Sequence, residues 1–184
     1  MTEPVVVRPA RPSDSEALID VHIASWKVAY RGQLPDEFLD RLDESRARRL
    51  ATWPRIFASD RERVFVAERG GTILGFAHVG PARAPAAPGL GELYAIYLHP
   101  SAWGEGVGRA LLLKGEDTLR ALGYRTVVLW VLDTNRRARR FYEAGGWSAD
   151  GETKVEHRGV VTLNEVRYAK ELTSERADAA RTRG

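Results

Sequence analysis

Three glycines at every second position form the part of this sequence best suited to chemistry. Gly104, Gly106 and Gly108 follow an apolar segment that ends at Leu98, and they precede an apolar helical pattern. Without side chains in the way, consecutive backbone N–H groups of such a loop can converge on an anion. The positive end of the following helix dipole adds to the attraction. The pattern therefore predicts a bound phosphate or pyrophosphate.

Two known phosphate loops fit these residues poorly. A Walker loop needs Gly-Lys-Ser/Thr where its helix starts, but Gly108 is followed by Arg109 and Ala110. A dinucleotide-binding loop has the spacing Gly-x-Gly-x-x-Gly and an acidic residue about 20 positions later. Here the spacing is Gly-x-Gly-x-Gly. The next apolar strand, at 126–132, contains no carboxylate, and the first one after it is Asp133. A glycine-rich turn that binds nothing remains an alternative.

Composition limits the class of protein. The 184 residues carry a net charge of +3, 43% are hydrophobic and none is cysteine. This length predicts one domain, which we expect over residues 1–172, with a disordered tail over 173–184. Without cysteine there are no disulfides or thiolate sites. The four histidines lack the spacing of a ligand pair, so we expect no metal.

Charge and hydropathy also bear on partners. The arginines are interspersed with carboxylates and form no long basic block, so nucleic acid is not an expected partner. No apolar run reaches the length of about 18 residues that a membrane helix needs. The N-terminus lacks the pattern of a signal peptide. We therefore expect a cytoplasmic protein with no membrane partner.

Hydrophobic periodicity predicts the elements that position the loop. A strand at 5–9 is followed by two helical regions, the second at 36–52, and by a hairpin over 64–79. An exposed, mobile connector at 81–91 leads to the strand 92–98. A helix, a strand at 126–132, a short helix at 135–144 and a final hairpin up to 170 complete the order. This order predicts a mixed α/β fold, with a sheet of about seven strands flanked by about four helices.

A second motif lies downstream of the loop. Asn135 is followed seven residues later by Tyr142, in the order A-x-x-F-Y-x-x-x-G-W. With the glycine loop, this motif resembles the GNAT superfamily, the Gcn5-related N-acetyltransferases, whose loop is usually written Arg/Gln-x-x-Gly-x-Gly/Ala. Order and spacing agree from about residue 60 to 170. Residues 22–36 resemble a common bacterial subset of the family.

The resemblance implies a twisted, mostly antiparallel sheet whose strands splay at a site for acetyl-CoA, the co-substrate. In the family, free backbone groups of the strand before the loop pair with the pantetheine amides, backbone N–H groups of the loop hold the pyrophosphate, and the Asn contacts the pantetheine arm. The cofactor-binding set carried over is Ile96, Tyr97, Leu98, Trp103, Gly104, Glu105, Gly106, Val107, Gly108, Arg109, Asn135, Arg139 and Tyr142.

Side-chain contacts to the phosphates of CoA follow less directly from the resemblance than the backbone contacts do. Trp103 stands where the family often has Arg or Gln, so the grip on pyrophosphate is expected to depend mainly on backbone N–H groups. Arg136, Arg139 and Arg140, on the helix after Asn135, could reach the nucleotide phosphates. A solvated helix face explains the same arginines.

Acetyl transfer to an amine calls for an acid and a base. The resemblance makes Tyr142 the acid that protonates the CoA sulfur, although packing in the core also explains a tyrosine there. Glu92 is the candidate base, because the family often has a carboxylate at the start of this strand; an ordinary strand-end residue is the alternative. Strand alternation puts Glu92, Tyr94, Ile96 and Leu98 on one face, up to any bulge. His22 is a third option.

The acceptor is expected between the first two helices and the final hairpin. Trp26, Tyr30, Tyr94 and Trp130 are the candidate substrate-binding residues, with Asp36 or Asp40 as partners for a cationic amine. Packing alone explains Trp26 and Tyr30 equally well. Trp130 stands where N-terminal protein acetyltransferases carry Glu, which argues mildly against that type.

The leading interpretation is therefore an N-acetyltransferase that uses acetyl-CoA and a primary amine of a small molecule, by direct attack in a ternary complex. A protein or peptide N-acetyltransferase and a non-catalytic acyl-CoA sensor are the alternatives. A homodimer is compatible with the resemblance. The sequence does not name the amine.

Overall fold

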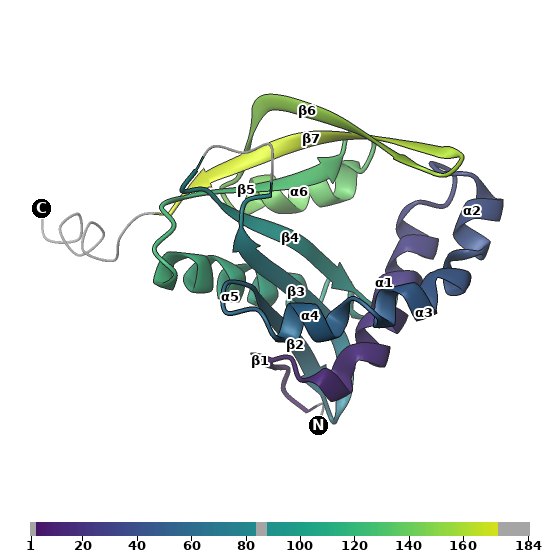
Figure 1. Ribbon diagram of the computed structural model, residues 1–184, viewed down its shortest axis with the longest axis horizontal. Helices are drawn as coiled ribbons and strands as arrows, with labels where there is room; N and C mark the ends of the chain where they lie inside the picture. Colours follow the sequence, from purple (N-terminus) through teal and green to yellow (C-terminus); the bar gives the residue numbers. More distant parts are fainter. Residues whose placement is uncertain (1–2, 84–87, 173–184) are drawn as a thin grey trace, which may run out of the picture.

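One mixed sheet organises the chain, in the order β1-β2-β3-β4-β5-β7-β6 (Figure 1). The computed structural model describes residues 3–83 and 88–172. Over these residues the strands are β1 (Val6–Pro9), β2 (Arg63–Arg69), β3 (Thr72–Pro81), β4 (Gly91–Leu98), β5 (Thr126–Leu132), β6 (Ser148–Arg158) and β7 (Val161–Glu171). The tail expected at 173–184 lies outside the described residues, as do residues 84–87 of the expected connector.

Six α-helices accompany the sheet in the described ranges. They are α1 (Ser15–Ala29), α2 (Asp36–Asp40), α3 (Arg46–Leu50), α4 (Trp53–Phe57), α5 (Val107–Ala121) and α6 (Arg136–Ala144). The expected fold class is confirmed, with α1, α5 and α6 as the longer helices. In the part of the chain that is described, no helix has the length and hydrophobicity to cross a membrane.

The second helical region differs from its prediction as one helix over 36–52. It is divided into α2, α3 and α4, with a 3-10 turn at Leu42–Ser45 between the first two. The turning path brings Leu39, Leu42 and Trp53 into one core on the face of the sheet that α1 covers.

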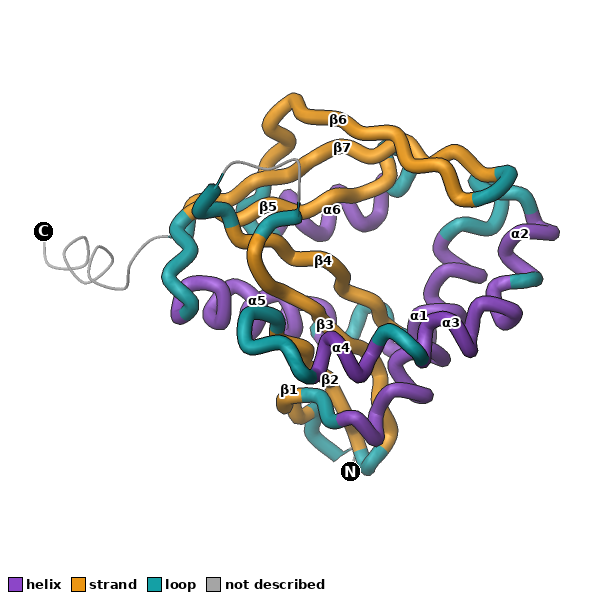
Figure 2. The backbone as a smooth tube through the Cα atoms, viewed as in Figure 1, coloured by secondary structure: helices purple, strands orange, loops and turns teal. Residues whose placement is uncertain are grey.

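The parallel pair β4–β5 is the interruption in an otherwise antiparallel sheet. The two strands are paired at two positions, Gly91 with Val127 and Glu92 with Val128. Beyond them the two strands diverge, as Figure 2 shows. The facing edges of β4 from 93 on and of β5 from 129 on therefore carry backbone groups that do not pair with each other. The expected splay of the strands is present.

Two hydrophobic cores cover the two faces of the sheet. The first includes Leu111 and Leu119 of α5, while the second includes Leu18 and Ile23 of α1. α5 lies close to the sheet because of Gly115, where an added Cβ would come within 3.2 Å of a methyl group of Val79. The glycine loop therefore starts a helix whose position is set by tight packing.

A β-bulge in β4 changes which side chains share a face. Leu93 pairs with Val79 and Ala95 pairs with His78, so Tyr94 is an extra residue on its strand. Such a residue shifts the side-chain alternation by one position.

The alternation expected along β4 therefore ends at this bulge. Ile96 and Leu98 pack against the core beneath α5. Tyr94 instead contacts His78, with ring centroids 4.7 Å apart, on the face where α4 lies. Glu92 precedes the bulge, so it shares no face with Ile96 and Leu98.

A buried carboxylate joins α5 to the end of the sheet where β4 and β5 pair. Glu116 is 5% exposed. It accepts hydrogen bonds from Trp147 Nε1 at 2.8 Å and from Lys170 Nζ at 2.7 Å. Lys170 also donates to the carbonyl of Gly145 at 2.7 Å. One cluster thus connects α5, the turn after α6 and β7.

This cluster yields a stability prediction. Lys170→Met leaves the Glu116 carboxylate buried with one neutral hydrogen-bond donor, and breaking such a pair costs about 3 kcal/mol of unfolding free energy. Urea unfolding measures the loss. The double variant Glu116→Gln/Lys170→Met, in which neither charge is present, is expected to recover at least half of it. A Lys170→Met protein as stable as the wild type would contradict the role given to the pair.

Candidate functional site

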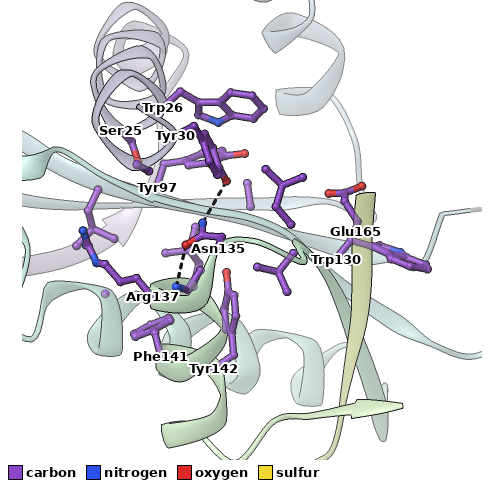
Figure 3. A pocket seen from close by; sticks show the side chains of 18 of the residues that line it. Ser25, Trp26, Tyr30, Tyr97, Trp130, Asn135, Arg137, Phe141, Tyr142 and Glu165 are labelled. Carbon is purple, nitrogen blue, oxygen red and sulfur yellow. Dashed lines mark hydrogen bonds between the residues drawn. The ribbon is translucent and has the colours of Figure 1, made fainter. Parts of the chain in front are cut away.

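A cavity of about 1060 Å³ opens where β4 and β5 separate. Its lining comes from β4, the glycine loop, the start of α6, α1 and the β6–β7 hairpin (Figure 3). Most of the residues proposed from the sequence are on this surface: Trp26, Tyr30, Tyr94, Ile96, Tyr97, Leu98, Trp103, Gly104, Gly106, Gly108, Arg109, Trp130, Asn135 and Tyr142. Four other residues proposed from the sequence are not among the described residues that line the cavity: Glu92, Glu105, Val107 and Arg139.

The three loop glycines have different physical roles. Gly104 and Gly106 have φ of 83° and 81°, in the left-handed region that favours glycine, and open space surrounds the Cβ that either would carry. Gly108 lies inside the helix, where an added Cβ would come 3.3 Å from the ring of Phe141. The first two therefore shape an open cradle at the N-terminus of α5, and the third lets α5 approach α6.

Trp103 has a structural partner on each side. Its indole Nε1 donates to the carbonyl of Leu98 at 3.1 Å. The guanidinium of Arg137, from α6, lies 3.3 Å from the centre of the indole ring. The stack holds a cation at the loop end of the cavity, which Arg137 lines.

Arg137 was not expected at the site from the sequence, whereas Arg139 was expected among the cofactor contacts. Arg139 donates to the hydroxyl of Tyr168 and to the carbonyl of Asp133, each at 3.0 Å, so its side chain points toward β7. Arg137 is four residues before Phe141, which also lines the cavity. Helical spacing from Phe141 was the signal that could have identified it.

Asn135 is committed to two interactions. Its Oδ1 accepts a hydrogen bond from the backbone N–H of Ala138 at 3.1 Å, which caps the N-terminus of α6. Its Nδ2 donates to the hydroxyl of Tyr30 at 3.3 Å (Figure 3). The residue therefore ties the start of α6 to α1 across the cavity.

Tyr142 lies deep in the cavity wall and is 9% exposed. Burial raises its pKa above the usual value, and the nearby hydroxyls of Tyr97 and Tyr30 act in the same direction. The phenol is therefore protonated at neutral pH. It has the protonation state that a hydrogen-bond or proton donor needs.

Glu92 is enclosed by Arg83. The carboxylate is 2% exposed. It accepts from the backbone N–H of Arg83 at 2.8 Å and from the guanidinium Nη2 at 2.6 Å. Both oxygens are thus occupied, and the carboxylate ties Arg83, just past the end of β3, to the start of β4.

His22 is too weak a base to take a proton from an ammonium group. It is 7% exposed and packs between the rings of Trp26 and Tyr97. Burial, with the positive charges of Arg49 and Arg158, lowers its pKa to about 3. It is not among the described residues that line the cavity.

The end of the cavity near the β6–β7 hairpin combines aromatic and charged groups. Trp26 and Tyr30 line it although they are largely buried, so they serve packing as well. Four charged residues of the β6–β7 hairpin were missed: Lys154, Glu156, Arg158 and Glu165. Their shared face follows from the antiparallel register of β6 against β7, which the sequence alone does not specify.

Two further expectations concern carboxylates. Asp36 and Asp40, named as amine partners, form ion pairs with Arg31 and are not among the described lining residues.

In the described ranges, no group of three or more His, Asp or Glu side chains could hold a metal ion.

Comparison with known proteins places this architecture among acetyltransferases. The family description "Acetyltransferase (GNAT) family" matches residues 23–147. The chain is 34% identical over 163 residues to the uncharacterized N-acetyltransferase YuaI of Bacillus subtilis, covering 85% of this chain and 87% of that protein. It is 36% identical over 118 residues to the mycothiol acetyltransferase of Thermomonospora curvata, covering 62% of this chain but only 35% of that protein.

A solved structure shares the fold at lower identity. The PaiA N-acetyltransferase of Thermoplasma acidophilum, solved in complex with coenzyme A, aligns with a TM-score of 0.70 and 23% identity, covering 91% of this chain and 99% of that one. At this identity the likeness concerns the fold.

The two interactions of Asn135 can be separated by mutation. Asn135→Ala removes the cap and is expected to lower the unfolding free energy by about 1 kcal/mol. Asn135→Asp keeps an oxygen acceptor at the N-terminus of α6 but loses the donor to Tyr30, so it should stay within about 0.5 kcal/mol of the wild type. Urea unfolding of both variants provides the measurement. Equal losses would assign the stabilisation to the Tyr30 contact instead.

Proposed function

The chain belongs to the GNAT family of acetyltransferases and is an N-acetyltransferase, and on this premise we propose that it acetylates a primary amine of a small molecule. The acetyl group comes from acetyl-CoA and passes directly to the amine while both substrates are bound. One observation carries the proposal: a single cavity has the anion cradle of α5 at one end and the charged, aromatic hairpin face at the other. Two substrates can therefore meet inside it.

The cofactor end suits a phosphorylated substrate. The backbone N–H groups of Gly104–Gly108 surround the N-terminus of a 15-residue helix, where the dipole favours an anion. Arg137, stacked on Trp103, adds a cation beside the loop. Among the described residues, that guanidinium has no hydrogen bond or ion pair, so its donors are available to a phosphate oxygen.

The unpaired edge of β4 suits the pantetheine arm. Ile96 and Tyr97 lie on the strand beyond the point where pairing with β5 ends. Amides of an extended ligand can pair with such an edge as an added strand would. The carbonyl of Leu98 already accepts from Trp103, so one of its two acceptor lone pairs is taken.

The reaction needs proton transfers at two atoms. The acceptor nitrogen must lose a proton before its lone pair attacks the thioester carbonyl carbon. As the carbon–sulfur bond breaks, the departing sulfur gains a proton. We assign the second role to Tyr142, because its phenol lines the cavity and burial keeps it protonated. Acid or base assistance of this kind contributes about 10²–10⁴-fold to a rate.

Turnover tests the proposal directly. The protein is incubated with acetyl-CoA and a panel of small amines and peptide N-termini, and release of free CoA thiol is followed. A small amine should release thiol well above the hydrolysis background. Preference for peptide N-termini would favour a protein N-acetyltransferase, and tight acetyl-CoA binding without turnover on any amine would favour an acyl-CoA sensor.

Tyr142→Phe separates catalysis from binding. The variant retains the ring but lacks the donor, so kcat is expected to fall about 100-fold while the Kd for acetyl-CoA stays within about twofold. Tyr124→Phe is the matched control, since Tyr124 lies outside the cavity lining; its rate should equal that of the wild type. An unaffected Tyr142→Phe rate would make Tyr142 a packing residue.

Arg137→Ala tests the cation at the loop. Loss of a charge-assisted contact is expected to raise the Kd for acetyl-CoA about tenfold, with kcat unchanged at saturation and a weaker dependence of binding on salt. Arg140→Ala removes a charge from the same helix outside the lining and should alter the Kd by less than twofold. Isothermal titration at two ionic strengths measures both variants. An equal change in Kd for both variants would mean that Arg137 acts only through its contribution to the net charge and makes no specific contact with the phosphate.

A further inference from the structure

We propose that Glu165, on β7, is the carboxylate that binds the ammonium group of the acceptor and takes the proton that the nitrogen must lose. This inference rests on the proposed function and assigns a residue to its unassigned step. It depends on where Glu165 lies, on what already occupies its oxygens and on the state of the competing groups.

Glu165 lies where β5, β6 and β7 run side by side. In the sheet it pairs with Leu132 of β5 on one side and Lys154 of β6 on the other. Its carboxylate and the hydroxyls of Tyr30 and Tyr142 belong to one cavity (Figure 3). An amine that enters from the hairpin side therefore meets Glu165 on the same surface as the proposed proton donor.

The carboxylate of Glu165 has unused hydrogen-bonding capacity. Its side chain is 16% exposed, and Oε2 is buried without a hydrogen-bond partner among the described residues. Lys154 Nζ lies 3.0 Å from Oε2 and forms an ion pair with it, without a hydrogen bond to that oxygen. A buried acceptor left unsatisfied is unfavourable. An ammonium group brings three donors and can satisfy it.

The other candidate proton acceptors either already accept hydrogen bonds from arginines or are weak bases. Both oxygens of Glu92 accept from Arg83. Glu156, the other carboxylate among the described lining residues, accepts two hydrogen bonds from Arg158, which lowers its pKa. His22 has its pKa lowered to about 3 by burial. Glu165 is thus the lining carboxylate with an acceptor to spare.

The groups that face Glu165 define its electrostatic setting. Lys154 and Arg158 of β6 bring positive charge. The hydroxyls of Tyr30, which follows α1, and of Tyr97 on β4 interact with it, and burial raises the pKa of both tyrosines. Both are therefore neutral across the physiological range. The other described carboxylate beside these groups, Glu156, is paired with Arg158.

The proton balance of the step is complete. The ammonium N–H transfers its proton to the Glu165 carboxylate, and the freed lone pair forms the C–N bond at the thioester carbonyl carbon. The C–S bond breaks, and sulfur takes the proton of Tyr142. The second proton of the attacking nitrogen is then released, which restores Tyr142, and the proton on Glu165 leaves to solvent. The products are an amide, free CoA and one net proton.

Glu165→Gln tests the assignment in the full-length protein. At pH 7, kcat/KM for the amine is expected to fall about 100-fold, while the Kd for acetyl-CoA changes less than twofold. The deficit should shrink as the pH rises toward about 10, the usual pKa of an alkyl ammonium, because the amine then arrives deprotonated. Glu165→Asp, which keeps a carboxylate, should recover part of the rate at pH 7.

Two controls separate this inference from the proposed function. Glu152→Gln removes an exposed carboxylate from the same hairpin, outside the lining, and should retain the wild-type rate. Glu92→Gln, checked for folding by its melting temperature and acetyl-CoA binding, tests the competing carboxylate. If the wild type acetylates no amine in the panel, the proposed function fails and this inference fails with it.

Three outcomes would overturn the inference alone. The first is wild-type kcat/KM in Glu165→Gln, above all if a folded Glu92→Gln protein is inactive. The second is loss of acetyl-CoA binding in Glu165→Gln, which would make the residue structural. The third is a rate deficit that stays constant across the pH range, which would exclude proton transfer to Glu165.

Discussion

The separation of β4 from β5 is the constraint on which the rest of the structure depends. Two recorded residue pairs join these strands, Gly91 with Val127 and Glu92 with Val128. Past them the strands are kept in place by side-chain packing, with one core on each face of the sheet. The cavity and the free edge of β4 are direct consequences of this separation.

The two ends of the separation are secured by different interactions. At the paired end, Lys170 is the β7 partner of Val127 and reaches Glu116 of α5. At the open end, the amide of Asn135 spans from the first turn of α6 to the hydroxyl of Tyr30, which follows α1. A buried charge pair closes one end, and a neutral polar bridge holds the other at a set width.

Much of this arrangement is predictable from local sequence. The bounds of β5, the helix after the glycine loop and the two motifs around Gly106 and Asn135 follow from periodicity and spacing, because these depend on neighbouring residues. The bulge at Tyr94 is not predictable in this way. It inserts one residue beside a glycine of a different strand, Gly80 of β3, which leaves room for the ring of Tyr94, and it reverses the face of every later side chain in β4.

The charged residues of the site escaped prediction for a related reason. Arg137 and Arg139 are two positions apart on one short helix, and only the packing of α6 determines that Arg137 stacks on Trp103. Glu165 faces the cavity because of the register between β6 and β7, which itself shifts between Ala149 and Thr153. Contacts between distant segments decide both, and no window of the sequence contains them.

The divided sheet also gives ligand binding a structural meaning. The segment up to β4 and the segment from β5 on share few backbone hydrogen bonds along their common border. An extended molecule with amide groups, laid along that border, takes the position of an absent strand and bonds to the exposed edge. Such a molecule adds to the free energy of folding by mass action, since it binds the folded chain and not the unfolded one. If acetyl-CoA binds there, as proposed, the substrate supplies the strand that the sheet lacks between β4 and β5.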